Sequence, residues 1–220
     1  MAESAAPDLA VLVFTRAPSP GAVKTRLIPA LGAARACALH RAMLRRTVLT
    51  ALDAGIGPVT LWCAPDAGHP YLRALGAELG VAARAQQGAD LGERMHAGLA
   101  ATLAAGCRGA VVVGSDCPFL TAADFRRAAA ALGGGDDAVL GPARDGGYVL
   151  LGVRRAHADL FADVAWGSPE VLAATRRNLA RLGWRWSELP VRDDIDRAED
   201  LALLRARAPE LLSADAAPEF

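Results

Sequence analysis

The sequence lacks the charge excess and the cysteine spacing that identify several common protein classes. Lys and Arg together number 24, as do Asp and Glu, so the formal net charge is zero. This balance excludes the broad basic surface typical of nucleic-acid-binding proteins, so a phosphate site would have to be local. The four cysteines form no Cys-x-x-Cys pair, which argues against a zinc site, a redox motif or a disulfide framework. We therefore expect reduced, structural cysteines.

Export and membrane signals are also missing. The start, MAESAAPDLAVLVF, carries acidic residues where a secretory signal needs basic ones, and its apolar run is too short to span a bilayer. We expect a cytoplasmic protein with no membrane partner. With 220 residues and 53% hydrophobic content, the chain can bury one substantial core. We predict a flexible N-terminus over residues 1–8, a single domain over 9–212 and a flexible tail over 213–220.

Strand and helix patterns alternate along the first half of the chain. Apolar, β-branched runs typical of buried strands are separated by alanine- and leucine-rich helical stretches; the runs are at 9–15, 58–63, 81–84 and 110–114. This alternation predicts right-handed βαβ crossovers. The rhythm then loosens, with strands expected at 138–141, 148–153 and 185–189 and a last helix at 198–207. The predicted fold class is α/β, a three-layer αβα sandwich with a mostly parallel mixed sheet.

The loop after the first predicted strand, RAPSPGAVKTRL at residues 16–27, has the composition of a phosphate site. Turn formers expose backbone amides, Lys24 supplies a point charge and Arg26 a two-pronged donor. A solvated loop would contain the same residues, but the position after the first strand of an α/β sheet favours phosphate. The Walker and G-x-G-x-x-G strings are absent, so ordinary kinases and dehydrogenases lose support. We assign nucleotide binding here to Phe14, Arg16, Gly21, Lys24, Thr25 and Arg26.

Acidic residues follow later predicted strands. Asp116 lies just past a buried strand in VVVGSDCPFL, where a carboxylate would face the ligand edge. Mg²⁺ and Mn²⁺ take oxygen ligands and bridge carboxylates to substrate phosphates, so Asp116 is a natural ligand. RDDIDRAED, at residues 192–200, offers Asp194 and Asp196 as further ligands. Turn formation and helix capping explain the same acids, and for the second cluster composition alone favours neither interpretation.

Two glycine-containing segments suggest close approach to a ligand. Asp145 precedes two glycines in DGGY, where it could bind an acceptor hydroxyl or act as a base, although a plain β-turn explains the same letters. We assign acceptor binding to Asp145, Gly146, Gly147, Tyr148 and Trp166. A position in the core explains Trp166 equally well.

In QGADLGERM, the glycines could approach a base or ribose, so nucleotide binding also includes Gln87, Gly88 and Gly92. The acids of this segment suit the start of a helix as well. The four histidines share no ligand-like spacing, and we assign none to metal or catalysis.

Six blocks in order resemble a known family: VKTRL, QGADLGERM, GSDCPFL, GPARDGGYVLLG, AWGSPEV and DIDRAEDL. Over about residues 12–201 the chain resembles the GT-A-type, Rossmann-like nucleotide-diphospho-sugar transferase superfamily. Within it, the resemblance is to small bacterial transferases associated with radical-SAM and selenium or arsenosugar gene neighbourhoods. The resemblance implies a GT-A fold, a divalent cation (Mg²⁺ or Mn²⁺) and a nucleotide at the carboxyl edge of the sheet. It also implies that Asp116 and Asp196 are metal ligands.

The match departs from the family at one point. Many glycosyltransferases of this fold carry Asp-x-Asp where this chain has a single acid in SDCP. That pattern, with the basic first loop, also resembles nucleotidyltransferases such as molybdenum-cofactor guanylyltransferase. The catalytic assignments are Lys24, Arg26, Asp116 and Asp145.

Three functions follow as hypotheses. The leading one is a glycosyltransferase that moves a sugar from a nucleotide-sugar to a small-molecule acceptor. The alternative is a nucleotidyltransferase that joins an NTP to a phosphorylated small molecule and releases pyrophosphate. A non-catalytic nucleotide-binding protein is the third, and the intact acids argue against it. The base, the sugar, the acceptor and the oligomeric state stay open.

Overall fold

The structure, a computed structural model, describes residues 8–213. Apart from Asp8 and Ser213, the ends predicted to be flexible lie outside the described residues. Those ends and the extent of the single domain therefore stay predictions. Among residues 8–213, no helix has both the length and the apolar character needed to cross a membrane.

The strands and helices alternate as the sequence predicts. The strands are β1 (Leu9–Arg16), β2 (Val59–Ala64), β3 (Ala82–Ala85), β4 (Gly109–Gly114), β5 (Ala138–Pro142), β6 (Tyr148–Val153) and β7 (Trp186–Glu188). The α-helices are α1 (Ile28–Leu31), α2 (Ala33–Ala54), α3 (Pro70–Leu79), α4 (Leu91–Ala104), α5 (Ala122–Gly133), α6 (Val171–Arg181) and α7 (Asp200–Arg207). Short 3₁₀ turns are η1 (Thr25–Leu27), η2 (Ala158–Phe161) and η3 (Pro209–Leu211).

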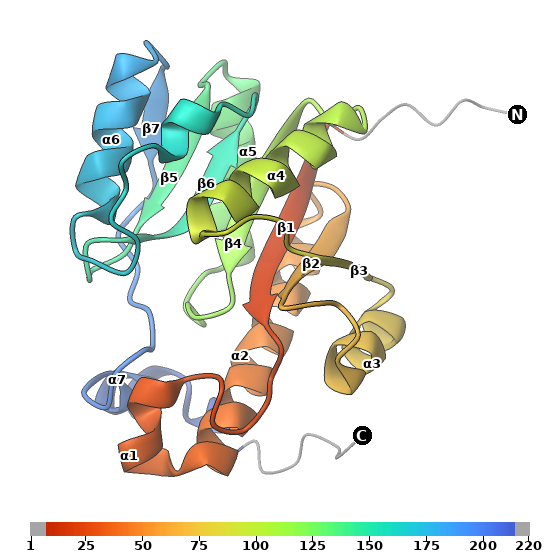
Figure 1. Cartoon of the computed structure of the whole chain (residues 1–220), viewed down its shortest axis with the longest axis vertical. Coiled ribbons are helices and arrows are strands. Elements are labelled where there is room, and N and C mark those ends of the chain that lie inside the picture. Colours follow the sequence, from red (N-terminus) through yellow and green to blue (C-terminus); the bar gives the residue numbers. More distant parts are fainter. Residues whose placement is uncertain (1–7, 214–220) are drawn as a thin grey trace, which may run out of the picture.

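The strands form one mixed sheet in the order β3-β2-β1-β4-β6-β5-β7 (Figure 1). Only β6 runs against its neighbours in this sheet of the described chain; the other pairings are parallel. The predicted fold class, a three-layer α/β sandwich with a mostly parallel mixed sheet, is confirmed. The parallel pairing of β1 with β4 has a functional consequence, because it brings the loops after both strands to the same edge.

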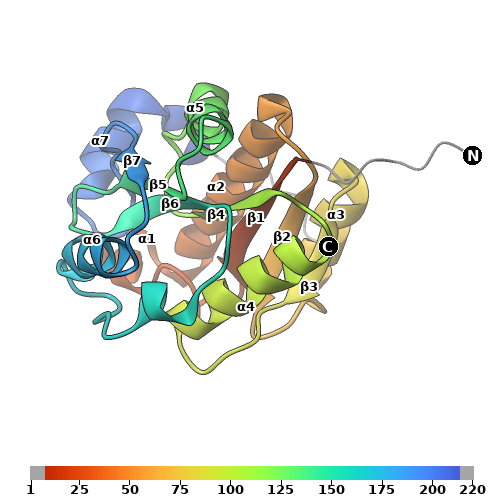
Figure 2. The same cartoon turned by 90° about the horizontal axis from the view of Figure 1, so that it is seen from above.

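Helices cover both faces of the sheet (Figure 2). In that view α2, α5 and α7 lie on one side of the strands, and α4 and α6 lie on the other. The buried side chains divide accordingly into two clusters. Along β1, Val11 and Val13 belong to the first cluster, whereas Leu12 and Phe14 belong to the second. Because both faces are buried, the strand reads as a continuous apolar run rather than an alternating one.

The last helix begins later than predicted. Residues 198–207 were expected to be helical, and α7 starts at Asp200. The carboxylate of Asp200 accepts hydrogen bonds from the backbone N–H groups of Asp196 and Arg197, at 2.9 and 2.6 Å. This turn holds Asp196 outside the helix and presents it at the carboxyl edge of the sheet.

Candidate active site

A pocket of about 480 Å³ opens at the carboxyl edge of β1 and β4. It is built from the first loop, the start of α4, the loop after β4 and the turn before α7. Its lining residues are Phe14, Thr15, Arg16, Ala22, Val23, Lys24, Thr25, Arg26, His40, Ala64, Gln86, Leu91, Arg94, Gly114, Ser115, Asp116 and Asp196. This position matches the rule that ligands of open α/β sheets bind beyond the carboxyl ends of the strands.

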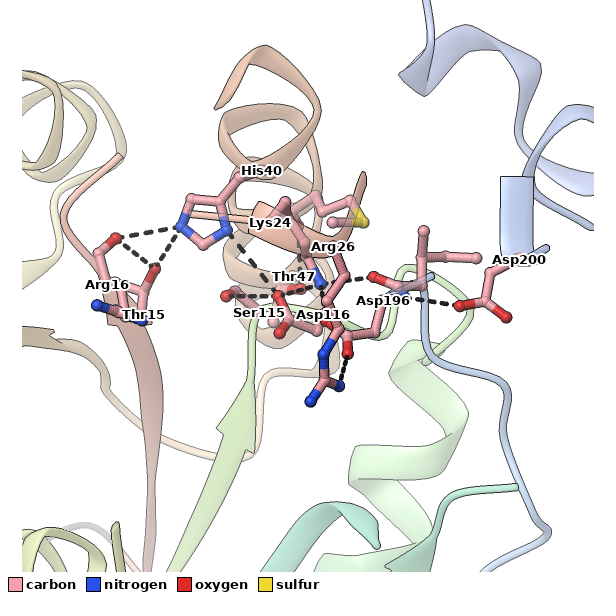
Figure 3. Close-up of polar contacts among 12 residues, drawn as sticks. Thr15, Arg16, Lys24, Arg26, His40, Thr47, Ser115, Asp116, Asp196 and Asp200 are labelled. Carbon is pink, nitrogen blue, oxygen red and sulfur yellow. Dashed lines mark hydrogen bonds and ion pairs between the residues drawn. The ribbon is translucent and has the colours of Figure 1, made fainter. Parts of the chain in front are cut away.

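Lys24 lies at the centre of the polar contacts in this pocket (Figure 3). Its Nζ is 3.0 Å from Oδ1 of Asp116 and 3.8 Å from Oδ1 of Asp196, and it donates a hydrogen bond to the carbonyl oxygen of Ile195. The side chain is only 2% exposed. The predicted phosphate-binding lysine and the two predicted metal ligands are thus in direct contact with one another.

The backbone of the first loop is strained at Lys24. Its φ of 48° lies in the left-handed region, which costs a residue with a side chain about 1–3 kcal/mol. Val23 and Leu27 are buried on either side, and the N–H of Leu27 donates to the carbonyl of Lys24, closing η1. The two apolar anchors fix the loop, and the left-handed turn between them directs the lysine inward.

Asp116 follows β4 and is tied to the turn before α7. Its backbone carbonyl accepts a hydrogen bond from the N–H of Ile195 at 2.9 Å. Burial raises the pKa of the carboxyl, but the charge of Lys24, with smaller contributions from His40 and Ser115, outweighs that effect and leaves the pKa below its ordinary value. The side chain is still 50% exposed, so Asp116 is an ionised carboxylate open to a ligand.

Arg26 contacts the second acid. Its Nη1 donates to Oδ2 of Asp196 at 2.6 Å, while its own side chain is 58% exposed. Arg16 and Thr25 also line the pocket. The cations of the first loop and the carboxylates of two distant loops therefore meet in one place.

His40 is a pocket residue that the sequence did not suggest. On α2 it is 4% exposed; its Nε2 lies 3.1 Å from the carbonyl of Arg16 and its Nδ1 3.9 Å from Oδ1 of Asp116. Burial lowers the pKa of the imidazole, which favours the neutral ring. Its spacing from other residues carries no signal, because only the packing of α2 against the end of β1 brings it here.

Three further lining residues follow β3: Gln86 lies directly after the strand, and Leu91 and Arg94 lie at the start of α4. The amide of Gln86 donates to the carbonyls of Thr15 and Trp62, at 3.2 and 2.8 Å, and so ties the ends of the strands together. Arg94 anchors its Nε on the carbonyl of Gly88 at 3.0 Å, and Leu91 is 44% exposed at the pocket. In QGADLGERM the sequence predicts nucleotide binding by Gln87, Gly88 and Gly92, whereas Leu91 and Arg94 are the members of the segment that line the pocket.

Several predicted site residues lie outside the lining of this pocket: Gly21, Gln87, Gly88, Gly92, Asp145, Gly146, Gly147, Tyr148, Trp166 and Asp194. Two of the glycines have packing reasons of their own. A Cβ on Gly88 would come 2.7 Å from Cβ of Glu93, and one on Gly92 would come 2.9 Å from the ring of Trp166. In the described structure these glycines allow the first turn of α4 to pack closely.

The DGGY segment forms a turn. Oδ1 of Asp145 accepts the N–H of Gly147 at 2.9 Å, and a Cβ on Gly146 would come 2.2 Å from the carbonyl oxygen of Pro169. The close approach that the glycines permit is thus to the segment before α6. Next to this turn, the rings of Tyr148 and Trp166 meet edge to face, 6.5 Å between centroids.

Asp194 differs electrostatically from Asp116. Burial, followed by the nearby charge of Asp145, raises the pKa of Asp194 to about 6. A carboxyl with this pKa is partly protonated near neutral pH unless a cation is bound close to it. Cys117, in the loop that carries Asp116, is buried, and burial raises its thiol pKa to about 12, so it stays protonated.

The residues present fit a divalent cation bound together with a ligand. Asp116 and Asp196 already converge on one positive group, the Lys24 ammonium. Mg²⁺ and Mn²⁺ are commonly held by one or two carboxylates, with substrate phosphates and water completing the shell. Within residues 8–213 no cluster of three or more His, Cys, Asp or Glu side chains could hold a metal by itself.

Solved structures similar to this chain include proteins named as transferases, the enzyme class predicted. A protein of Desulfovibrio desulfuricans G20, provisionally named a nucleotide-diphospho-sugar transferase, shares 29% identity and a TM-score of 0.82, covering 94% of this chain and 93% of that one. CMP:2-keto-3-deoxy-manno-octonic acid synthetase, solved with CTP, shares 10% identity and a TM-score of 0.59, covering 92% and 99%.

A third structure contains a metal. Rv0371c of Mycobacterium tuberculosis, solved with manganese, shares 18% identity and a TM-score of 0.55, covering 91% of this chain and 100% of that one. At the identities of this protein and the synthetase, the likeness shows the fold alone. A comparison with curated proteins finds no significant sequence match. A family model described as "Uncharacterized protein conserved in bacteria (DUF2064)" matches residues 47–168, more than half of the sequence, and the chain therefore belongs to this family.

Proposed function

We propose that this chain is a metal-dependent transferase that uses a nucleotide-activated donor. The observation that carries the proposal is the convergence of Lys24, Asp116 and Asp196 from three separate loops in one pocket. Cations beside metal-binding carboxylates suit the phosphates of a nucleotide, whose charge must be balanced while a group is transferred. The similarity to the D. desulfuricans protein supports the same class of donor.

Each pocket residue has a proposed role. Lys24 and Arg26 bind the phosphates, and Arg16 and Thr25 extend that site along the first loop. Asp116, with Asp196, would hold Mg²⁺ or Mn²⁺, and Asp194 is a further candidate ligand. When bound, the ion would neutralise charge that develops on the departing nucleotide. The half-exposed carboxylate of Asp116 is open to the pocket from which such a ligand would enter.

Glycosyl transfer is the leading reaction. The supporting observation is the 29% identity, over nearly all of both chains, to a protein named for nucleotide-diphospho-sugar transfer. The resemblance to transferases of radical-SAM and selenium or arsenosugar gene neighbourhoods favours a small molecule as the acceptor of the sugar. In this proposal Asp145, with Gly146, Gly147, Tyr148 and Trp166, contributes to the acceptor side, and Gln87, Gly88, Gly92 and Gly21 lie toward the nucleotide.

Nucleotidyl transfer is the second candidate, and one contact favours it. The ammonium of Lys24 and the carboxylate of Asp116 are 3.0 Å apart, so Lys24 and an ion on Asp116 would act on the same phosphate group. That arrangement suits attack on an α-phosphate with pyrophosphate leaving. The similarity of fold to a CTP-bound synthetase, and the resemblance to molybdenum-cofactor guanylyltransferase, agree with it.

A panel of donors separates the two reactions. Binding of nucleoside triphosphates and of nucleotide-sugars would be measured by calorimetry and thermal shift, each with and without Mg²⁺ or Mn²⁺. Glycosyl transfer predicts binding of nucleotide-sugars, whereas preference for triphosphates moves the assignment to nucleotidyl transfer. Failure of every donor to bind, with either ion, would remove the proposed function.

A further inference from the structure

The ammonium of Lys24 is already engaged by protein acceptors in the described conformation. A lysine ammonium carries three N–H donors. Nζ donates to the carbonyl of Ile195 and lies 3.0 Å from Oδ1 of Asp116, and Oδ1 of Asp196 is an ion-pair partner at 3.8 Å. The side chain is only 2% exposed, so these protein groups are its main partners. A phosphate that binds Lys24 therefore competes with the two carboxylates for the ammonium.

The charges of this group are also already balanced. Asp116 and Asp196 bring two negative charges; Lys24 and Arg26 bring two positive ones, with Nη1 of Arg26 2.6 Å from Asp196. A free divalent cation approaching the carboxylates would meet a neutral cluster whose centre holds an ammonium of the same sign. The ammonium of Lys24 and the incoming cation would repel each other strongly, because both are positive and the site is partly buried.

A polyphosphate changes this balance. It brings several negative charges and several acceptor oxygens, so Lys24 and Arg26 gain new partners and the two carboxylates are released. The pocket accommodates this exchange, because both cations and both acids line it. The left-handed backbone at Lys24 shows that the loop is held in a costly conformation, with the side chain directed at the acids.

We propose that the site accepts its divalent cation as a metal–polyphosphate complex and excludes the free ion, and that Lys24 is the residue that sets this specificity. The inference rests on the proposed function, because it treats the carboxylates as the metal site of a nucleotide-dependent enzyme. It assigns Lys24 two successive partners: the carboxylates in the empty protein and the phosphates in the loaded one.

Retention of Mn²⁺ by the full chain tests the proposal without nucleotide or turnover. Equilibrium dialysis and the EPR signal of free Mn²⁺ would give the affinity of wild type, Lys24→Met, the double variant Lys24→Met/Asp116→Asn, and Arg45→Met. Arg45 pairs with Glu78 on the surface, so its variant removes one positive charge away from the pocket. Unfolding curves would establish that each variant is folded.

The expected pattern is specific. Lys24→Met should bind Mn²⁺ alone at least about tenfold more tightly than wild type, because the competing charge is gone. Arg45→Met should match wild type, and the double variant should lose the gain. With inorganic tripolyphosphate, wild type should retain more Mn²⁺ than without it. This last comparison needs no variant, so it holds even if Lys24→Met fails to fold.

Two outcomes would overturn the proposal: Mn²⁺ affinity that is equal in wild type and folded Lys24→Met, or tripolyphosphate that strips Mn²⁺ from wild type instead of adding it. The panel of nucleotide donors tests the proposed function separately, so the two proposals can fail independently. If no nucleotide binds but the Mn²⁺ pattern is as expected, the nucleotide donor of the proposed function falls, while its metal site and the role of Lys24 at that site stand. If nucleotides bind but the Mn²⁺ pattern is absent, only the assignment of Lys24 falls.

Discussion

Asp116 combines partial exposure with contact to a buried charge. Half of its side chain is accessible, yet its Oδ1 is 3.0 Å from an ammonium that is almost wholly enclosed. For Lys24 the carboxylate is a charged partner that replaces water, and removing one member of such a pair leaves the other without compensation. The same acid that is available to a metal ion therefore also stabilises the first loop.

Replacing Asp116 with Asn should destabilise the protein in a pH-dependent way. The folded pKa lies below the ordinary value of 3.8, so the carboxylate contributes stability above that pH and loses it as the pH falls through the folded pKa. Discounted for solvent screening, the loss at pH 7 is about 1 kcal/mol. Urea unfolding of both proteins at several pH values would measure it.

The difference between wild type and Asp116→Asn should shrink below about pH 4. Asp53→Asn is a suitable control, because the Asp53 side chain is 75% exposed and lies 3.8 Å from an exposed arginine. That change should alter the free energy of unfolding by less than about 0.5 kcal/mol. A difference for Asp116→Asn that is independent of pH would show that the contact with Lys24 contributes no stability.

At the scale of elements, the turn between β5 and β6 is fixed by its packing. Gly146 has a φ of 91°, and the carbonyl of Pro169 lies where a Cβ would stand. The carbonyl of Gly146 in turn accepts the N–H of Leu172 in the first turn of α6, at 2.9 Å. The turn thus joins the sheet to the segment that carries Trp166.

Gly146→Ala should lower the free energy of unfolding by at least about 2 kcal/mol, since both the left-handed backbone and the 2.2 Å approach to Pro169 oppose a side chain. Gly147→Ala is the matched control. Its backbone is not left-handed, and its nearest neighbour is the Asp145 carboxylate at 3.2 Å, so the expected loss is under about 1 kcal/mol. Equal losses in denaturant unfolding would contradict this account of the turn.

Sequence patterns predicted elements better than contacts between them. Strands β1, β2 and β4 could be recognised because burial on both faces leaves a nearly uninterrupted apolar run. The loops that follow them were placed at the right edge because parallel strands end at the same edge of the sheet. Short elements such as α1 and η2 were missed, because four residues are too few to show a period. His40 was missed because its role depends on which helix face meets the end of β1.

For the whole molecule, topology determines what the pocket contains. The parallel pairing of β1 with β4 aligns two loops that are distant in sequence, and the backbone contact of Ile195 with Asp116 adds a third. The sequence predicted that Lys24 would bind phosphate and Asp116 metal as separate halves of one site. Their direct contact could not be predicted, because it depends on three-dimensional loop conformations, including the left-handed turn at Lys24.

The net charge of zero is consistent with this arrangement. Two cations of the pocket, Lys24 and Arg26, are matched locally by Asp116 and Asp196, so phosphate binding at these two residues requires existing ion pairs to rearrange. Such a site selects among ligands by the geometry of their acceptor groups and by their ability to replace the protein partners of Lys24 and Arg26. Long-range attraction alone would not provide this selectivity.

The most direct test of the account is the position of Mn²⁺ in crystals grown with the donor that binds best in the panel. Anomalous scattering at the manganese edge identifies the ion independently of the refined coordinates. We predict a peak within coordination distance of the Asp116 carboxylate, with donor phosphates against Lys24 and Arg26. A peak remote from Asp116, or a donor bound outside this pocket, would contradict it.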